Sequence, residues 1–178
     1  SLAAIQSRHD HELGVLVRLK KINRSRLSPK DQLNYDLFQK QYETNVEEHQ
    51  YRWYLVPLNQ REGIQTVDEL ADALRFQTVK DYEDWIARLH SLPVYIDQTI
   101  ALMREGVRTR IVQPKVVMAR VPAQIDKQIV DDAKRSRFYK PFESFPRSFT
   151  TEQIARYRSD AEEAIEGNVV PAYAKFKA

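Results

Sequence analysis

Apolar residues recur at spacings of three and four along almost the whole chain, and this period constrains the fold more than any other feature. The longest run lies between Tyr82 and Val107, where apolar side chains fall on one face of a helix. No segment alternates between apolar and polar residues over the length of a strand. The sequence therefore predicts an all-α fold of long antiparallel helices in a bundle or array, with about six helices and no significant sheet.

The first two helices are delimited by capping residues and by proline. The first should run from Ala3 to Ile22, and the second begins at Ser28, a good N-cap, followed by Pro29 at the first helical position. Helical spacing then continues from Tyr35 to Trp53 as a seam of mainly aromatic side chains. We expect this helix to last until Pro57 and the seam to be mostly core.

The later helices are predicted from capping signals, prolines and one glycine. Pro93 should kink or break the long helix, because proline removes a backbone hydrogen bond, and Gly106 should end it in a left-handed conformation. Pro114 should open a helix that reaches Ile129, and Pro171 should kink the last helix. The capping signals place a short helix after Thr66 and Glu69, the long helix from Thr78 or Lys80, and the last helix from Thr150 or Thr151.

The longest irregular stretch is "KRSRFYKPFESFPRSF", residues 134–149. Connections of this length in compact domains are uncommon and are usually functional or fixed by packing. Aromatic side chains bury about 150–250 Å² each when they dock. We therefore expect this stretch to be pinned to the helices by Phe138, Tyr139, Phe142, Phe145 and Phe149.

Length and composition indicate one folded helical domain over residues 1–178. The chain has 4 glycines, 8 prolines and a formal charge of +3, too small an excess of basic residues to demand nucleic acid. No apolar run reaches the roughly 20 residues that a membrane span needs. The absence of cysteine excludes disulfides and thiolate chemistry but leaves the cellular compartment open.

The motif "HDHE", residues 9–12, resembles the start of a metal site. On a helix His9 and His11 point about 200° apart, whereas the zinc-binding helix pattern needs histidines four residues apart. His9 and Glu12 do lie three residues apart and could supply two ligands of a site completed elsewhere. A packed helix histidine is the favoured interpretation, so we assign no metal ligand and no catalytic residue to this chain.

Five residues are candidates to face a ligand cleft: Tyr42, His49 and Trp53 on the aromatic seam, and Arg108 and Arg110 in a basic segment. His49 is polar within an aromatic seam, although a buried histidine with one hydrogen bond is the favoured interpretation. The basic segments Lys20–Arg26 and Arg104–Arg120 are interleaved with acidic residues or lie at the end of a helix. Solvated surface is therefore the favoured interpretation for both, rather than a phosphate-binding site.

Five blocks of sequence, in order, carry a family resemblance: "SPKDQLNYDLFQKQY", "LVPLNQREGIQ", "DYEDWIARLHSLPVYIDQTIALMREGV", "QPKVVM" and "EEAIEGNVVPAYAKFKA". They resemble a bacterial family catalogued as domain of unknown function 885 over nearly all of Gln32–Lys177. The family often has a glycine near position 110, where this chain has Arg110.

The resemblance implies a large, almost wholly helical zinc metallopeptidase whose metal-binding histidine-glutamate motif lies downstream of these residues. The chain would then be an N-terminal region that forms one wall of a substrate cleft and is inactive alone, with zinc bound by the missing part. Its partners would be the remainder of the protein and a peptide substrate, with no nucleic acid and no membrane span. The alternative is an independent helical module that binds a protein or peptide, and a third hypothesis is a nucleic-acid binder that uses Arg108 and Arg110.

The end of the chain predicts how it behaves in isolation. The helical pattern still continues at Tyr173 and Phe176, with no capping glycine after them. We therefore expect an apolar patch along Tyr157–Phe176 and also along the Tyr35–Trp53 seam, through which the isolated chain can self-associate.

Overall fold

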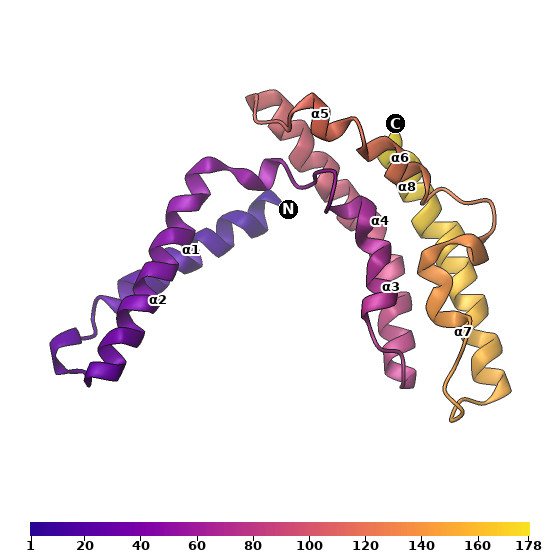
Figure 1. Ribbon diagram of the computed structural model, residues 1–178, viewed down its shortest axis with the longest axis horizontal. Coiled ribbons are helices and arrows are strands. Elements are labelled where there is room, and N and C mark those ends of the chain that lie inside the picture. Colours follow the sequence, from indigo (N-terminus) through magenta and orange to yellow (C-terminus); the bar gives the residue numbers. More distant parts are fainter.

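The computed structural model describes residues 1–178 and is all-α with no strand, as the sequence predicts. Figure 1 shows two parts that diverge from a common junction: an arm of two helices and a body that contains the others. None of the helices combines the length and the apolar composition that a membrane crossing requires. The α-helices are α1 (Leu2–Leu19), α2 (Pro29–Glu48), α3 (Leu70–Ala73), α4 (Val79–Thr109), α5 (Lys115–Met118), α6 (Val121–Asp126), α7 (Thr151–Ala164) and α8 (Val170–Lys177).

The arm is an antiparallel hairpin of α1 and α2. Among residues 1–53 only Val15 and Leu19 are buried, and α2 has no buried residue. The expectation that the Tyr35–Trp53 seam is core is therefore wrong, because α2 packs against one helix and leaves its other sides at the surface. The contacts that cross the hairpin in antiparallel register join His9 to His49, Glu12 to Asn45, and the Leu19 carbonyl to Tyr35.

Three predicted helix starts are confirmed. The Ser28 hydroxyl caps α2, and Thr78 and Thr150 form capping boxes at α4 and α7. The short helix predicted after Thr66 and Glu69 is present as α3, but the predicted capping box is wrong, since Thr66 lies inside the 3-10 helix η4 (Ile64–Glu69) and its hydroxyl donates to the Gly63 carbonyl. Each confirmed cap joins residues only three positions apart, which is why the sequence alone could predict these helix starts.

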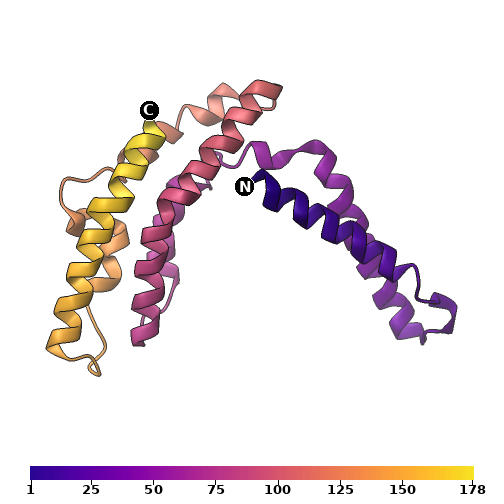
Figure 2. The same ribbon diagram turned by 180° about the vertical axis from the view of Figure 1, so that it is seen from behind.

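The core lies in the body, where α4 packs against α7 and α8; Figure 2 shows these helices from behind. One cluster of 21 buried residues extends from Leu58 to Tyr173 and includes no residue of the arm. Trp85, 2% exposed, donates its ring N–H to the Phe138 carbonyl at 3.0 Å. Tyr173, fully buried, donates to the Ile64 carbonyl at 2.6 Å. The polar groups of these two buried rings thus find backbone partners across the core.

Of the two outcomes predicted for Pro93, a kink or a break, the break does not occur. Helix α4 continues through Pro93, and Leu89, Leu92 and Ile96 on either side of it are buried in the core. Before Pro171 the chain forms a π-helical turn, η7 (Ile165–Val169), in which a wider turn accommodates the missing N–H of proline.

The helix predicted from Pro114 to Ile129 is wrong as a single element. Pro114 caps α5, which is only four residues long, and α6 follows after Ala119 and Arg120. These two short helices cover the end of the body where α4 stops (Figure 1).

The connection 134–149 is pinned to the body, as predicted. It contains the 3-10 helix η6 (Arg137–Phe142), and no part of it forms an α-helix. Its ring contacts with Tyr82 continue an aromatic cluster that extends from α4 to α7. The buried or core-packed aromatics of this connection are Phe138, Tyr139, Phe142, Phe145 and Phe149.

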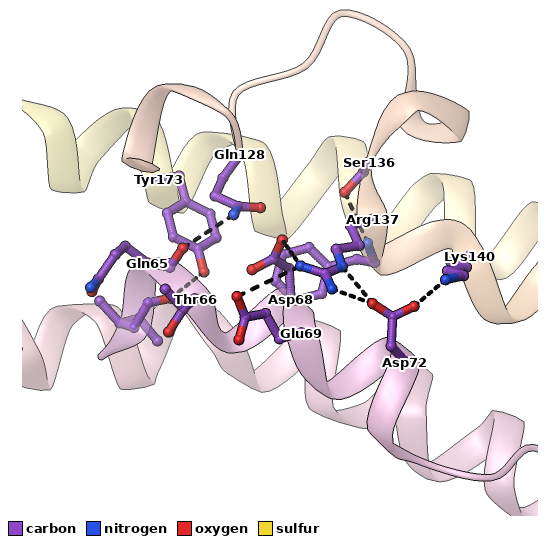
Figure 3. A network of polar contacts seen from close by, with 12 residues as sticks. Gln65, Thr66, Asp68, Glu69, Asp72, Gln128, Ser136, Arg137, Lys140 and Tyr173 are labelled. Carbon is purple, nitrogen blue, oxygen red and sulfur yellow. Dashed lines mark hydrogen bonds and ion pairs between the residues drawn. The ribbon is translucent and has the colours of Figure 1, made fainter. Parts of the chain in front are cut away.

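A polar network also fixes this connection (Figure 3). Arg137 and Lys140 both point toward Asp72 of α3, and both form ion pairs with it. Further along, the Gln128 amide donates to the Gln65 backbone carbonyl at 3.2 Å. The network therefore joins η4 and α3 to the segment before α7. The residues that it connects are more than sixty positions apart in the sequence.

The apolar patch expected on the last helix is not there. Tyr157 and Tyr173 are 3% and 0% exposed, and Phe176 packs against the core cluster. Large apolar side chains are exposed on both the arm and the body, and several of those on the arm lie on α2, which has only α1 as a neighbour. On the arm they include Leu33 (59% exposed), Leu37 (62%), Phe38 (45%) and Trp53 (67%), and on the body Val94 (60%), Val107 (68%) and Val116 (77%).

Candidate functional site

The junction between arm and body begins where α2 ends. After Glu48 the chain makes a 3-10 turn, and Arg52 then adopts a left-handed conformation with φ 54° and ψ 35°. This conformation costs a residue other than glycine about 1–2 kcal/mol. It turns the chain into the 3-10 helix η3 (Trp53–Leu55), whose Leu55 is 1% exposed. The prediction that α2 continues through Trp53 is therefore wrong.

Gly106 of α4 lets η3 approach the body closely. A β-carbon on Gly106 would lie 2.8 Å from the Leu55 carbonyl oxygen and 2.6 Å from the Ile111 carbonyl oxygen. The Ile111 N–H donates to the Gly106 carbonyl at 2.8 Å. Three backbone segments therefore meet at a position where only glycine leaves room.

The prediction that Gly106 ends the long helix in a left-handed conformation is wrong. Helix α4 continues to Thr109, and Arg110 is the left-handed residue, with φ 62° and ψ 30°. Arg110 thus occupies the position after a helix end that glycine usually fills.

A charged network crosses the junction at Glu105. Its carboxylate accepts from Arg52 at 3.1 Å and from Arg108 at 2.7 Å through both of its oxygens. The hydrogen bonds from Arg108 hold the pKa of the Glu105 carboxyl below its usual range. A second tie joins the N-terminal amino group of Ser1 to the Gln98 side chain at 3.0 Å. Both ties connect the arm to α4.

An apolar pocket of about 180 Å³ opens at the junction, whereas Glu105 and Arg108 line a separate hollow. Eight of its ten lining residues are hydrophobic, and they come from η3 and the residues after it, from the end of α4, and from the segment up to α5. This volume suits one large apolar side chain, since pockets for drug-sized molecules measure about 300–1,000 Å³. The lining residues include Leu55, Leu58, Met103, Val107, Val112 and Met118.

The structure divides the five predicted cleft-facing residues into two groups. Tyr42 packs on Phe38 within the arm, with ring centroids 4.6 Å apart, and His49 stacks on His9 at 3.8 Å. Trp53, Arg108 and Arg110 instead belong to the three segments that meet at the junction.

Sequence reasoning missed the pocket. Its lining comes from residues 55–58 and from residues 103–118, which are far apart in the chain, and no periodicity links them. The one signal was a pair of short apolar stretches next to proline, "LVPL" (residues 55–58) and "IVQP" (residues 111–114), neither of which has helical spacing.

His9 and Glu12 of the motif at residues 9–12 each contact a residue of the other helix of the arm or of the turn that follows it. The rings of His9 and His49 lie face to face at an interplanar angle of 16°, so their nitrogens do not converge on one point. Glu12 accepts a hydrogen bond from Asn45 at 3.2 Å. No group of three or more histidine, cysteine, aspartate or glutamate side chains is arranged to hold a metal ion.

Fold and junction together define a class: an all-α protein whose helical arm meets a helical body beside an apolar pocket. Over residues 1–178 the chain matches the model of the family described as "Bacterial protein of unknown function (DUF885)", and it belongs to this family. The resemblance found in the sequence blocks is thereby confirmed at the level of the family. Comparisons with curated proteins and with solved structures found no match.

Proposed function

We propose that this chain is a non-catalytic helical region of a bacterial zinc-dependent peptidase and that its junction binds polypeptide substrate as part of the cleft wall. Zinc and the catalytic groups would belong to residues outside this chain, because the histidines and carboxylates here do not converge. The zinc part of the proposal rests on the family resemblance alone, and the binding part rests on the junction.

One observation supports the binding part best: an apolar pocket sized for a side chain opens at the junction, and the exposed Arg110 directly precedes its lining residue Ile111. Eight of the ten lining residues are hydrophobic, and Val107 and Val112 at its edge are 68% and 59% exposed. Convergent apolar surface next to a few polar groups is typical of sites that bind a ligand. A polypeptide offers both the apolar side chain and the backbone that such a site needs.

Peptide hydrolysis by the intact parent protein tests the proposal. The parent should cleave unfolded polypeptides or mixed peptides, and removal of zinc by a chelator should abolish the cleavage. The 178-residue chain should bind the same peptides without cleaving them. Cleavage by the chain alone, or a parent that cleaves no peptide, would contradict the peptidase proposal.

The pocket also favours a second function, that of a self-contained helical module that binds a protein or peptide. In that case the chain would bind its partner with the same affinity as the parent does. Peptide binding by both, with no hydrolysis by the parent at any zinc concentration, would select this function over the first.

A further inference from the structure

The segment that lines the pocket carries a dense positive charge. Residues 104–120 contain five cationic side chains, Arg104, Arg108, Arg110, Lys115 and Arg120, and all five are exposed. The same segment has one acidic residue, Glu105, which is already paired with Arg52 and Arg108.

Most of this charge has no partner within the chain. Of the five cations only Arg108 forms an ion pair, whereas the cations Arg137 and Lys140 of the body share Asp72. Arg110 immediately precedes Ile111, a lining residue, so a free cation lies one residue from the pocket. An acidic ligand would therefore meet uncompensated positive charge beside the apolar lining.

The chemistry of the lining favours a polypeptide over a nucleic acid. Single-stranded nucleic acids bind by stacking their bases on aromatic rings, and no aromatic residue lines this pocket. Met103 and Met118 line it instead, and flexible thioether side chains adapt to apolar groups of different shape. The Gln113 amide is already used by the Leu58 carbonyl at 3.3 Å, which leaves few polar donors inside.

We propose that the pocket between Leu55 and Met118 takes one bulky apolar side chain of a polypeptide segment whose neighbouring residues are acidic. The apolar side chain fills the pocket, and the flanking carboxylates lie near Arg110 and Lys115. This inference rests on the proposed function, since it names the kind of polypeptide that the junction binds. It is distinct from the question of hydrolysis.

Three fluorescent peptides of equal length test this inference by anisotropy with the 178-residue chain. The first has a central phenylalanine flanked by glutamates, the second has glutamines in place of the glutamates, and the third has alanine in place of the phenylalanine. The first should bind roughly tenfold more tightly than either of the others. The second lacks the attraction between carboxylates and the cations, and the third lacks the apolar side chain that fills the pocket. Added salt should weaken the first peptide and leave the second nearly unchanged.

Two variants separate the pocket from the charge. Val107→Asp should weaken the first peptide at least tenfold, since it puts a carboxylate at the pocket edge on an exposed position where folding tolerates it. Arg110→Gly should weaken the first peptide several-fold but not the second, and glycine suits the left-handed backbone there. Lys40→Gln, which removes an exposed cation of α2, is the matched control and should change neither.

The outcomes distinguish this inference from the proposed function. Equal binding of the first two peptides would overturn the acidic preference and leave polypeptide binding standing. Failure of all three to bind would overturn both this inference and polypeptide binding at the junction. If a single-stranded RNA oligonucleotide displaces the first peptide at lower concentrations than an unlabelled copy of the peptide does, the basic segment would be assigned to nucleic acid instead.

Discussion

Leu55 and Gly106 meet backbone to backbone: the Leu55 carbonyl oxygen lies 2.8 Å from the point where Gly106 would carry a β-carbon. Leu55 follows the arm, and Gly106 lies in the last turn of α4. This contact therefore sets how closely the arm approaches the body, and it forms one side of the apolar pocket.

Gly106→Ala should destabilise the chain by about 1–3 kcal/mol, because both neighbouring atoms are backbone oxygens that cannot move aside cheaply. Gly14→Ala is the control in α1, where the nearest atom to a β-carbon is the flexible end of Arg18 at 3.5 Å. That change should stabilise by about 0.5–1 kcal/mol, since alanine favours a helix interior. Urea unfolding measures both, and equal effects would mean that the close approach at Gly106 does not exist.

Arg110→Gly should stabilise the chain by about 1 kcal/mol, because Arg110 holds φ at 62° and a β-carbon is strained there. Arg110→Ala removes the same charge but keeps the β-carbon, so it should not stabilise. Thermal or urea unfolding of the two variants separates backbone strain from charge. Equal stability of the glycine and alanine variants would show that strain at this position is absent.

Position 110 also shows which parts of the fold the sequence can predict. The caps at Ser28, Thr78 and Thr150 depend on residues three positions away, so local patterns were enough. The end of α4 depends on packing between backbones at Gly106, and the glycine therefore lies inside the helix while an arginine takes the left-handed turn. Local residue preference instead predicted that Gly106 takes the left-handed conformation at the end of the helix, the conformation that Arg110 has in the structure.

The candidate site was harder to predict than the fold. Helical spacing alone cannot tell a seam that packs against the core from one that packs against a single helix, so the Tyr35–Trp53 seam looked like core. Neither glycine nor proline marks the left-handed turn at Arg52 in the sequence. Because of this turn, Trp53 lies at the junction and not on α2. The pocket depends on the meeting of distant segments, which is a property of the tertiary fold.

Acid should weaken the tie between α3 and the connection before α7. Hydrogen bonds from Lys140 and Arg137 hold the pKa of the Asp72 carboxyl below its ordinary value. A carboxyl with a lowered pKa in the folded state stabilises the fold above its unfolded pKa, and this contribution is lost as the pH falls through the lowered value. Asp72→Asn should therefore reduce the free energy of unfolding at pH 7 and make it less sensitive to acid.

Urea unfolding at pH 7 and near pH 3 measures this effect. Asp84→Asn is the control, since Asp84 pairs with Lys80 within one helix at the surface and such pairs contribute little. If acid destabilises the Asp72 variant as much as the unchanged chain, this carboxylate does not provide the acid sensitivity.

Limited trypsin digestion should spare the connection 134–149 in the folded chain. Lys140 and Arg147 are exposed, but Phe138 and Phe142 beside Lys140 are 1% and 0% exposed and keep the backbone from entering a protease. Cutting should occur first at Lys20 or Lys21, in the turn of the arm, where no core residue holds the chain. First cleavage at Lys140 or Arg147 would show that the aromatic anchors release the connection in solution.

The arm should drive self-association of the isolated chain. Leu33 and Leu37 lie four residues apart on one face of α2 and are 59% and 62% exposed, and Leu13 and Val17 repeat this spacing on α1 at 41% and 59%. Apolar patches of several hundred Å² rarely stay uncovered in monomeric proteins. Sedimentation should therefore show association that rises with concentration, together with binding of a hydrophobic dye.

A double variant, Leu33→Gln with Leu37→Gln, should make the chain monomeric and reduce dye binding while leaving its unfolding nearly unchanged, because neither side chain is buried. Val94→Gln is the matched control, since Val94 is 60% exposed on α4, outside the α1–α2 hairpin, and its removal should leave association intact. If the double variant associates as strongly as the unchanged chain, the residues that form the contact between chains do not lie on this face of α2. A chain that stays monomeric at all concentrations and binds no dye would mean that the hairpin is stable in water without a partner on its apolar face.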